Sequence, residues 1–329
     1  MKSKTKWIVF EGLFKDYCER FIAYMQNSGY KYGISTQRNL RYISLTLNDN
    51  AEDNLPIITQ EMANKVVKLK GGESKGTRQS RVSLLRKFAI FINLDGGKAY
   101  VFPKGILPVY RNDFIPYVFS HKQITAVLEM AEHMEPTGRS LNHMIFPVLL
   151  KILYSAGLRL NEALSLKVGD YNPEDNSLSI HESKNFKSRI VPLSCSMGTC
   201  MGEYFCRMNF EQEEEPFIFP AHSGEKLNRS SAGNILKSIY KKAGIPVDSR
   251  EYFPTANSLR HTFALHALEK MHEQGMDSYR SIALLSQYLG HVSITETEKY
   301  LRLPQYKING DEAIPLHSGR IPEVLYEEG

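Results

Sequence analysis

Apolar residues in the first hundred positions recur at helical spacing. The first stripe has members at i, i+4, i+7, i+8 and i+11, namely Phe14, Cys18, Phe21, Ile22 and Met25. Similar stretches run from Ser35 or Thr36 to Leu47, over 59–69 and over 75–93, the last two followed by paired glycines. The pattern predicts a bundle of four short helices within residues 1–97.

Residues 98–112 contain two prolines and a glycine and have no clear periodicity, which is typical of an interdomain linker. Beyond it, the sequence predicts helices over 120–132, with a Ser cap, and over 141–156. Pro147 must either kink the second of these helices or mark its first turn, because proline lacks the backbone N–H. A second domain is therefore expected to begin near residue 113.

Alternating apolar and polar residues over 177–193 predict a β-hairpin with residues 184–186 at its tip. Helical patterns return from residue 230. The expected fold is mainly α with a small β-hairpin or sheet: an α-helical first domain, and a second domain of mixed α+β type.

Composition is that of an ordinary globular protein, with 42% hydrophobic and 23% charged residues. The apolar run 144–153 is too short and too interrupted to span a bilayer, so no membrane association and a cytoplasmic location are expected. The cysteines, Cys18, Cys195, Cys200 and Cys206, have no standard metal-ligand spacing and are expected to be reduced thiols.

The net charge of +5 conceals an asymmetry. Residues 1–112 hold 19 Lys and Arg against 9 Asp and Glu, whereas the remainder holds 22 against 27. A basic module beside a mildly acidic one is typical of a nucleic-acid-binding domain joined to a catalytic domain. Four basic residues share one predicted helix and are candidates for DNA phosphate contacts, with an ordinary solvated face as the alternative: Lys75, Arg78, Arg81 and Arg86.

Four motifs of the second domain carry the candidate chemistry. They are AGLRLNEA (156–163), Ser183-Lys184 with RIVPL (189–193), NSLRHTF (257–263), and LGH (289–291) with Tyr300 nine residues later. Their residue types and order resemble the tyrosine recombinase (phage integrase) family over residues 113–303. The details of LSQYLGH and TEKYLRL most resemble recombinases of transposons and other mobile elements.

The resemblance implies an enzyme that cuts and rejoins DNA through a 3′-phosphotyrosyl bond to Tyr300. Arg159 and Arg260 match the two arginines of the family, and a guanidinium can donate two hydrogen bonds to a phosphate without losing its charge. Lys184 matches the hairpin lysine that acts as a general acid, although Lys187 is the alternative if the hairpin register slips. His291 matches the histidine that supports the nucleophile and binds the phosphate.

One position departs from the family pattern. Asn257 stands where the family usually has a histidine, three residues before the second arginine. An asparagine can hydrogen-bond a phosphate oxygen but cannot carry a proton or a charge. His261, which follows Arg260, is not expected to replace it.

The resemblance also identifies residues 1–97 as a core-binding domain and implies double-stranded DNA with inverted half-sites as the partner. A homotetramer on paired sites, no cofactor and no metal are expected. The tail, 304–329, has apolar residues that must pack on its own domain or on a neighbour, and the resemblance favours exchange between protomers. The alternatives are a DNA-binding protein that no longer cleaves, a nicking topoisomerase, and a metal-dependent nuclease or transposase.

Overall fold

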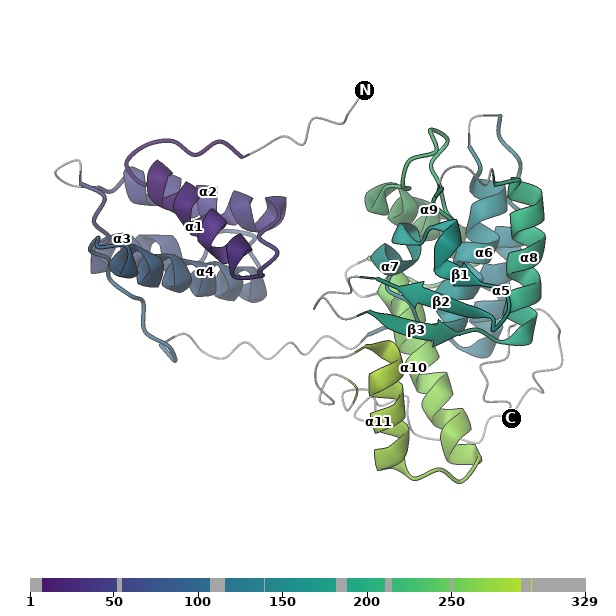
Figure 1. Cartoon of the computed structure of the whole chain (residues 1–329). Helices are drawn as coiled ribbons and strands as arrows, with labels where there is room; N and C mark the ends of the chain where they lie inside the picture. The colour runs from purple at the N-terminus through teal and green to yellow at the C-terminus, as the bar shows by residue number, and fades with distance from the viewer. Residues whose placement is uncertain are drawn as a thin grey trace. The chain divides into compact units, whose positions relative to one another are not determined.

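The structure is a computed structural model that describes residues 8–51, 55–106, 116–138, 140–181, 188–210, 215–248, 251–290 and 297 (Figure 1). The chain divides into two compact units, Met1–Phe114 and Ile115–Gly329. The helices of unit 1 are α1 (Lys15–Asn27), α2 (Ile34–Asn48), α3 (Gln60–Val67) and α4 (Lys75–Leu94). The four helices expected from the periodicity are confirmed within one or two residues.

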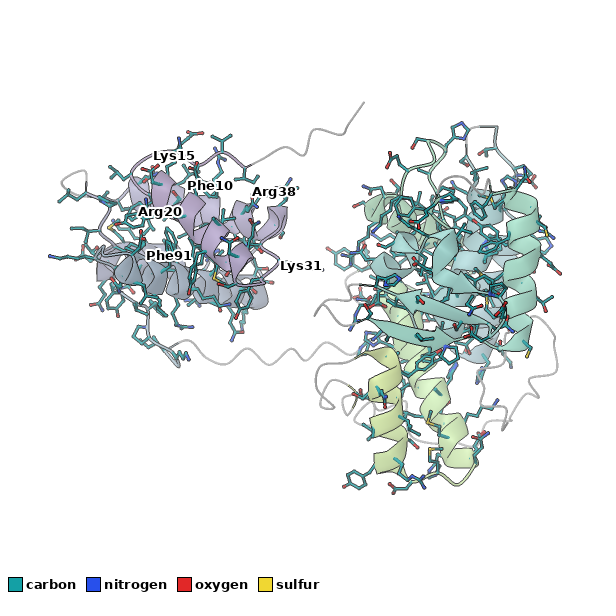
Figure 2. The ribbon with its side chains drawn as sticks, viewed as in Figure 1. Phe10, Lys15, Arg20, Lys31, Arg38 and Phe91 are labelled. Carbon is teal, nitrogen blue, oxygen red and sulfur yellow. The ribbon has the colours of Figure 1, made fainter. Side chains whose placement is uncertain are left out.

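Apolar side chains from all four helices form the core of unit 1. Phe21 of α1 lies at its centre, with its ring 5.3 Å from that of Phe88 and 5.4 Å from that of Phe91. Figure 2 shows Phe91 between the helices, whereas Lys15 and Arg38 project from the surface. The apolar stripe therefore faces inward while basic side chains such as Lys15 and Arg38 face outward, as the hydrophobic effect favours.

The first six residues of the expected linker pack against unit 1. The backbone of Tyr100 donates to the Ile58 carbonyl at 2.8 Å, and Ala99 forms a bridge with Ile58. Phe102 is buried in the core of the unit. Residues 98–103 of the expected linker thus lie against the core of unit 1, because an irregular segment without periodicity can still bury one large aromatic side chain. Residues 107–115 lie outside the described part of the chain.

Unit 2 contains a helical layer and a small sheet (Figure 1). Its elements, in chain order, are α5 (His121–Glu132), α6 (Asn142–Ser155), α7 (Leu160–Ser165), η1 (Val168–Asp170), β1 (Tyr171–Asn172), β2 (Ser177–Ile180), β3 (Arg189–Pro192), α8 (Cys195–Met208), α9 (Arg229–Lys242), α10 (Ala256–Glu273) and α11 (Ser278–Leu289). Within the described residues the sheet is antiparallel in the order β1-β2-β3. The mainly α fold with a small sheet is confirmed.

Local signals explain where these elements begin. The Ser120 side chain caps α5 by accepting from the Gln123 backbone, and the Gln123 side chain reciprocates in a capping box. α6 is almost wholly buried and contacts α5, α8 and α10, so it is the centre of unit 2. Pro147 lies inside α6, which leaves the His143 carbonyl without its helical donor. None of the helices in the described ranges has the length and apolar character that a bilayer-spanning segment needs.

Arg81 holds α3 and α4 together and is 3% exposed. Its Nε donates to the Val66 carbonyl at 2.9 Å and its Nη2 to the Lys68 carbonyl at 2.9 Å, where α3 ends. Its Nη1 forms an ion pair with Glu73. The expectation that Arg81 contacts DNA does not fit this burial, because its guanidinium is used to join two helices.

We therefore predict that Arg81→Ala destabilises unit 1. Removing one partner of a buried ion pair costs about 3–5 kcal/mol, because a charge and two carbonyls lose their partner. Hydrogen exchange of α3 and α4 backbone amides should accelerate by at least ~10²-fold. Lys75→Ala, at an exposed position of the same helix, is the matched control and should leave the exchange nearly unchanged.

Candidate active site

A tight turn between α6 and α7 places Arg159. Gly157 in this turn has φ +58°, and a Cβ there would lie 2.4 Å from the Phe263 ring, so both backbone conformation and space require glycine. Arg159 follows in extended conformation as the N-cap of α7. Its side chain is 26% exposed and reaches solvent, while its backbone is fixed at the start of α7.

Glu162, in the first turn of α7, binds this arginine. Its Oε1 accepts from Arg159 Nη1 at 2.8 Å, and its Oε2 accepts from the Arg159 backbone N–H at 3.0 Å. A carboxylate is favoured there, because the first helical turn presents unpaired N–H groups and a positive dipole end. With a side chain only 8% exposed, Glu162 is nonetheless largely withdrawn from water.

Arg189, the first residue of β3, binds the same carboxylate from the other side. Its Nη2 lies 2.9 Å from Glu162 Oε2 and its Nη1 lies 3.3 Å from Oε1, which is a bidentate pair. Burial alone would raise the pKa of Glu162. The hydrogen bonds and charges of Arg189 and then Arg159 outweigh burial and lower its pKa to about 2.

Arg260, on α10, completes the group of three arginines. It is 4% exposed, and its Nη1 lies 4.0 Å from Glu162 Oε2. Its Nη1 and Nη2 each donate at 2.7 Å to a backbone carbonyl, that of Gly157 and that of Leu289. The structure thus brings Arg159 and Arg260, which stand 101 positions apart in the sequence, around one carboxylate.

Asn257 and His261 flank Arg260 on α10. Asn257 is exposed and stands three residues before Arg260, which places both on one side of the helix. Burial and then the charge of Arg260 lower the pKa of His261 to about 4. His261 is therefore neutral at pH 7, which agrees with the expectation that it does not supply the cation missing at Asn257.

Three expected site residues, Lys184, His291 and Tyr300, lie outside the described residues. The elements that lead to two of them are described. β2 ends at Ile180 and β3 begins at Arg189, on either side of the segment that contains Lys184. α11 ends at Leu289, and Gly290, in the left-handed conformation with φ +64°, directly precedes His291.

The sequence reasoning missed Glu162 and the role of Arg189. A signal for Glu162 was present, because an acid three residues after an N-cap position is the second half of a capping box. Arg189 is the first residue of the RIVPL motif, but nothing in the local sequence indicated its partners, which come from α7 and from the end of α11.

On α4, the remaining three residues of the expected DNA-binding set keep part of their side chains accessible. Lys75 is exposed, and Arg78 and Arg86 are half-buried. Arg78 Nε donates to the Val67 carbonyl, and Arg86 Nε donates to the Phe102 carbonyl, both at 2.7 Å. Each arginine is thus anchored at its Nε, and Arg86 also donates through Nη2 to the Pro103 carbonyl at 3.0 Å.

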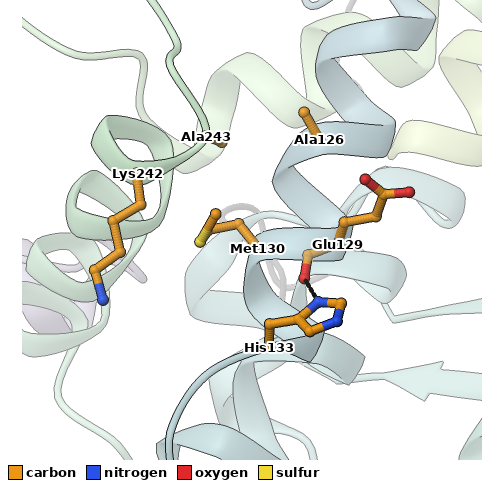
Figure 3. Close-up of a pocket in the computed structure, with 6 residues that line it drawn as sticks. All are labelled: Ala126, Glu129, Met130, His133, Lys242 and Ala243. Carbon is orange, nitrogen blue, oxygen red and sulfur yellow. Dashed lines mark hydrogen bonds between the residues drawn. The ribbon is translucent and has the colours of Figure 1, made fainter.

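Two other features of unit 2 lie apart from the arginine group. His121, His266 and Glu269 bring possible ligand atoms within 4.8 Å of one another, but the imidazole rings stack at 4.1 Å. Stacked rings direct their lone pairs side by side, so one of them would have to turn before both could bind a metal at ~2 Å. A hollow between α5 and α9 contains none of the motif residues and is lined by Ala126, Glu129, Met130, His133, Lys242 and Ala243 (Figure 3).

Comparison with known protein families and sequences shows the family of the chain. The phage integrase family matches residues 118–306, more than half of the chain. The integrase/recombinase-type protein y4rB of Sinorhizobium fredii is 28% identical over 88% of this chain and 92% of its own length. Tyrosine recombinase XerD of Listeria innocua is 27% identical over 73% of this chain and 75% of its own.

Solved structures share the fold. A XerH site-specific recombinase in a pre-cleavage complex superposes with a TM-score of 0.66 at 19% identity, covering 92% of this chain and 97% of that one. The Tn1549 transposon integrase gives 0.59 at 18% identity, covering 86% and 94%. The protein therefore belongs to the phage integrase family and is a tyrosine-type site-specific recombinase.

The low pKa of Glu162 predicts how stability depends on pH. Because the pKa falls from an ordinary 4.5 to about 2 in the folded chain, the stabilisation is complete above about pH 4.5 and is lost as the pH falls toward 2. The difference in Tm between wild type and Glu162→Gln should therefore narrow between pH 5 and pH 3. Glu203→Gln, at an exposed position of α8, is the matched control. A difference in Tm that stays constant for Glu162→Gln would contradict the ion pairs described above.

Proposed function

We propose that this recombinase cuts and rejoins DNA strands through a 3′-phosphotyrosyl bond to Tyr300. The convergence of Arg159 and Arg260 carries the proposal. Two guanidinium groups from distant segments meet at one place, and three arginines there face one carboxylate. A group of fixed cations from three elements suits an anion, and a DNA phosphate is the anion that a recombinase must bind.

The proposed reaction uses each motif residue once. The Tyr300 oxygen attacks the phosphorus and gives its proton to water, while the bond from phosphorus to the 5′ oxygen breaks. Lys184 gives a proton to the departing 5′ oxygen, and the arginines with His291 stabilise the charge that develops on the phosphate. Asn257, exposed beside Arg260, adds an uncharged hydrogen bond. The phosphotyrosyl bond conserves the energy of the phosphodiester that was cut. A 5′-hydroxyl can therefore reverse the step without ATP or a metal.

The proposed substrate is double-stranded DNA with inverted half-sites. Residues 1–97 act as the core-binding domain, with Lys75, Arg78 and Arg86 reaching phosphates, and residues 113–303 act as the catalytic domain. The XerH structure is a complex with a palindromic difH substrate, and the Tn1549 integrase structure is a complex with transposon right end DNA. We infer integration, excision or transposition of a mobile element as the biological purpose, carried out in the cytoplasm where bacterial DNA lies.

We also infer a homotetramer on paired sites, with the tail 304–329 exchanged between protomers. The tail contains Ile314, Leu316, Val324 and Leu325, whose apolar surface is costly to leave in water at about 25 cal/mol per Å². Deletion of 312–329 should leave binding to one half-site intact and abolish pairing of two sites. Light scattering of the DNA-bound protein measures this, and tetramers of the truncated chain would contradict the exchange.

The decisive test is covalent attachment to DNA. Binding sites are first selected from random duplexes with Tyr300→Phe, which should bind DNA without cutting it. A nicked form of the selected duplex should then trap wild type as a covalent adduct in EDTA. Tyr300→Phe should give none, and Arg159→Ala and Arg260→Ala should slow adduct formation by at least ~10²-fold. Normal adduct yield from the Phe variant would rule out Tyr300 as nucleophile.

The leaving group tests Lys184. A 5′-bridging sulfur departs without being protonated, so it should restore cleavage by Lys184→Ala but not by the arginine variants. Lys187→Ala is the matched control at the neighbouring lysine. If the sulfur rescues Lys187→Ala instead, the general acid is Lys187.

A further inference from the structure

Arg189 contacts two separate parts of the candidate active site, Glu162 and the end of α11. Its guanidinium binds both carboxylate oxygens of Glu162 and, through Nε, donates to the Tyr288 carbonyl at 3.1 Å. Its own backbone begins β3, the strand that follows the segment with Lys184. One side chain thus joins the α7 turn, the hairpin and the end of α11, three motifs that are far apart in sequence.

The contact with Glu162 determines where Arg159 lies. Glu162 Oε1 accepts from one nitrogen of each arginine, and Oε2 accepts from Arg189 and from the backbone of Arg159. A carboxylate with both oxygens bound in this way cannot rotate about its terminal bond without breaking several charge-assisted hydrogen bonds. Because Arg189 supplies two of them, it fixes the surface against which the partly exposed Arg159 side chain is held.

The contact of Arg189 with α11 lies at the end of the helix, just before His291 in the sequence. A Cβ at Gly290 would lie 3.1 Å from Arg189 Nη1 and 3.2 Å from its Cδ, so the guanidinium packs directly against this backbone. A second bond joins the same elements, because the Tyr288 hydroxyl donates to the Pro192 carbonyl at 3.3 Å. The first and last residues of β3, Arg189 and Pro192, therefore both contact Tyr288 in the last turn of α11, three residues before His291.

We propose that Arg189 is a positioning residue of strand cleavage: through Glu162 and the end of α11 it sets the places of Arg159 and His291 around the phosphate. The inference rests on the proposed function. Its side chain is 12% exposed and its donors point at Glu162 and Tyr288, so the DNA is held by its neighbours and Arg189 acts through them. A displacement of about 1 Å in a catalytic group can cost ~10²-fold in rate, which sets the expected effect.

Lysine at this position separates positioning from stability. Arg189→Lys keeps a positive charge opposite the Glu162 carboxylate, so most of the electrostatic stabilisation remains. A single ammonium cannot bind both Glu162 oxygens in plane and also reach the Tyr288 carbonyl, because it lacks the rigid fork of arginine. A purely structural role predicts that lysine restores stability and cleavage together, whereas positioning predicts that it restores stability alone.

The experiment uses the full chain and the duplex selected with Tyr300→Phe. Arg189→Gln, Arg189→Lys and the control Arg207→Gln, at an exposed position of α8, are compared for Tm, for affinity and for the single-turnover rate of adduct formation on the nicked duplex. We expect affinity within about threefold of wild type for all three. The cleavage rate should fall ~10²-fold for Arg189→Gln, at least ~10-fold for Arg189→Lys despite a near-normal Tm, and not at all for Arg207→Gln.

A double variant tests the route through Glu162. If Arg189 acts through this carboxylate, Arg189→Gln combined with Glu162→Gln should cleave no more slowly than the slower single variant. Multiplicative losses, full cleavage by Arg189→Lys, or a cleavage rate of Arg189→Gln within twofold of wild type would each overturn the proposal. In those cases wild type still forms the adduct, whereas a wild-type chain that forms none overturns the proposed function itself and this inference with it.

Discussion

The ionised carboxylate of Glu162 is the group on which the arrangement of the site depends. A carboxylate that is 8% exposed would be unstable without partners, because desolvation of an ion costs several kcal/mol. Here Arg159 and Arg189 supply four hydrogen bonds and two positive charges. The buried negative charge is therefore stabilised only when two separate elements, α7 and β3, lie in their final places. The ion pair therefore couples correct folding of unit 2 to correct placement of the arginines.

Close backbone packing makes this convergence possible. Gly157 and Gly290 both adopt positive φ; a Cβ at Gly157 would collide with Phe263, and one at Gly290 would press against Arg189 at 3.1 Å. Arg260 then joins the two glycine-containing turns by donating to one carbonyl in each. A buried guanidinium with fixed carbonyl partners loses little further freedom when an anion arrives, so its orientation is set before DNA binds. The turns, the buried arginine and the ion pair thus act as one unit.

Sequence periodicity was sufficient for the four helices of unit 1, and the Ser120 cap for the start of α5, because these are local signals. It was not sufficient for residues 98–103, where one buried aromatic, Phe102, holds an irregular segment to the core. Motif spacing indicated Arg159 and Arg260 but not Arg189, because the partners of that arginine are formed by tertiary contact between α7, β3 and α11. What a side chain touches across the fold cannot be read from its neighbours in sequence.

Arg81 is the converse case, because the sequence indicated a DNA contact for it and the structure places it between two helices. Arg81 and Arg260 are both almost fully buried, and both donate to two backbone carbonyls, so neither burial nor backbone bonding distinguishes a structural arginine from one at an active site. The balance of charge among the described residues does. Arg81 is paired directly with Glu73, whereas Arg260 shares Glu162 with two further arginines. A direct ion pair between two helices acts as a clamp, whereas arginines from three elements around one carboxylate form a cationic group that suits a phosphate.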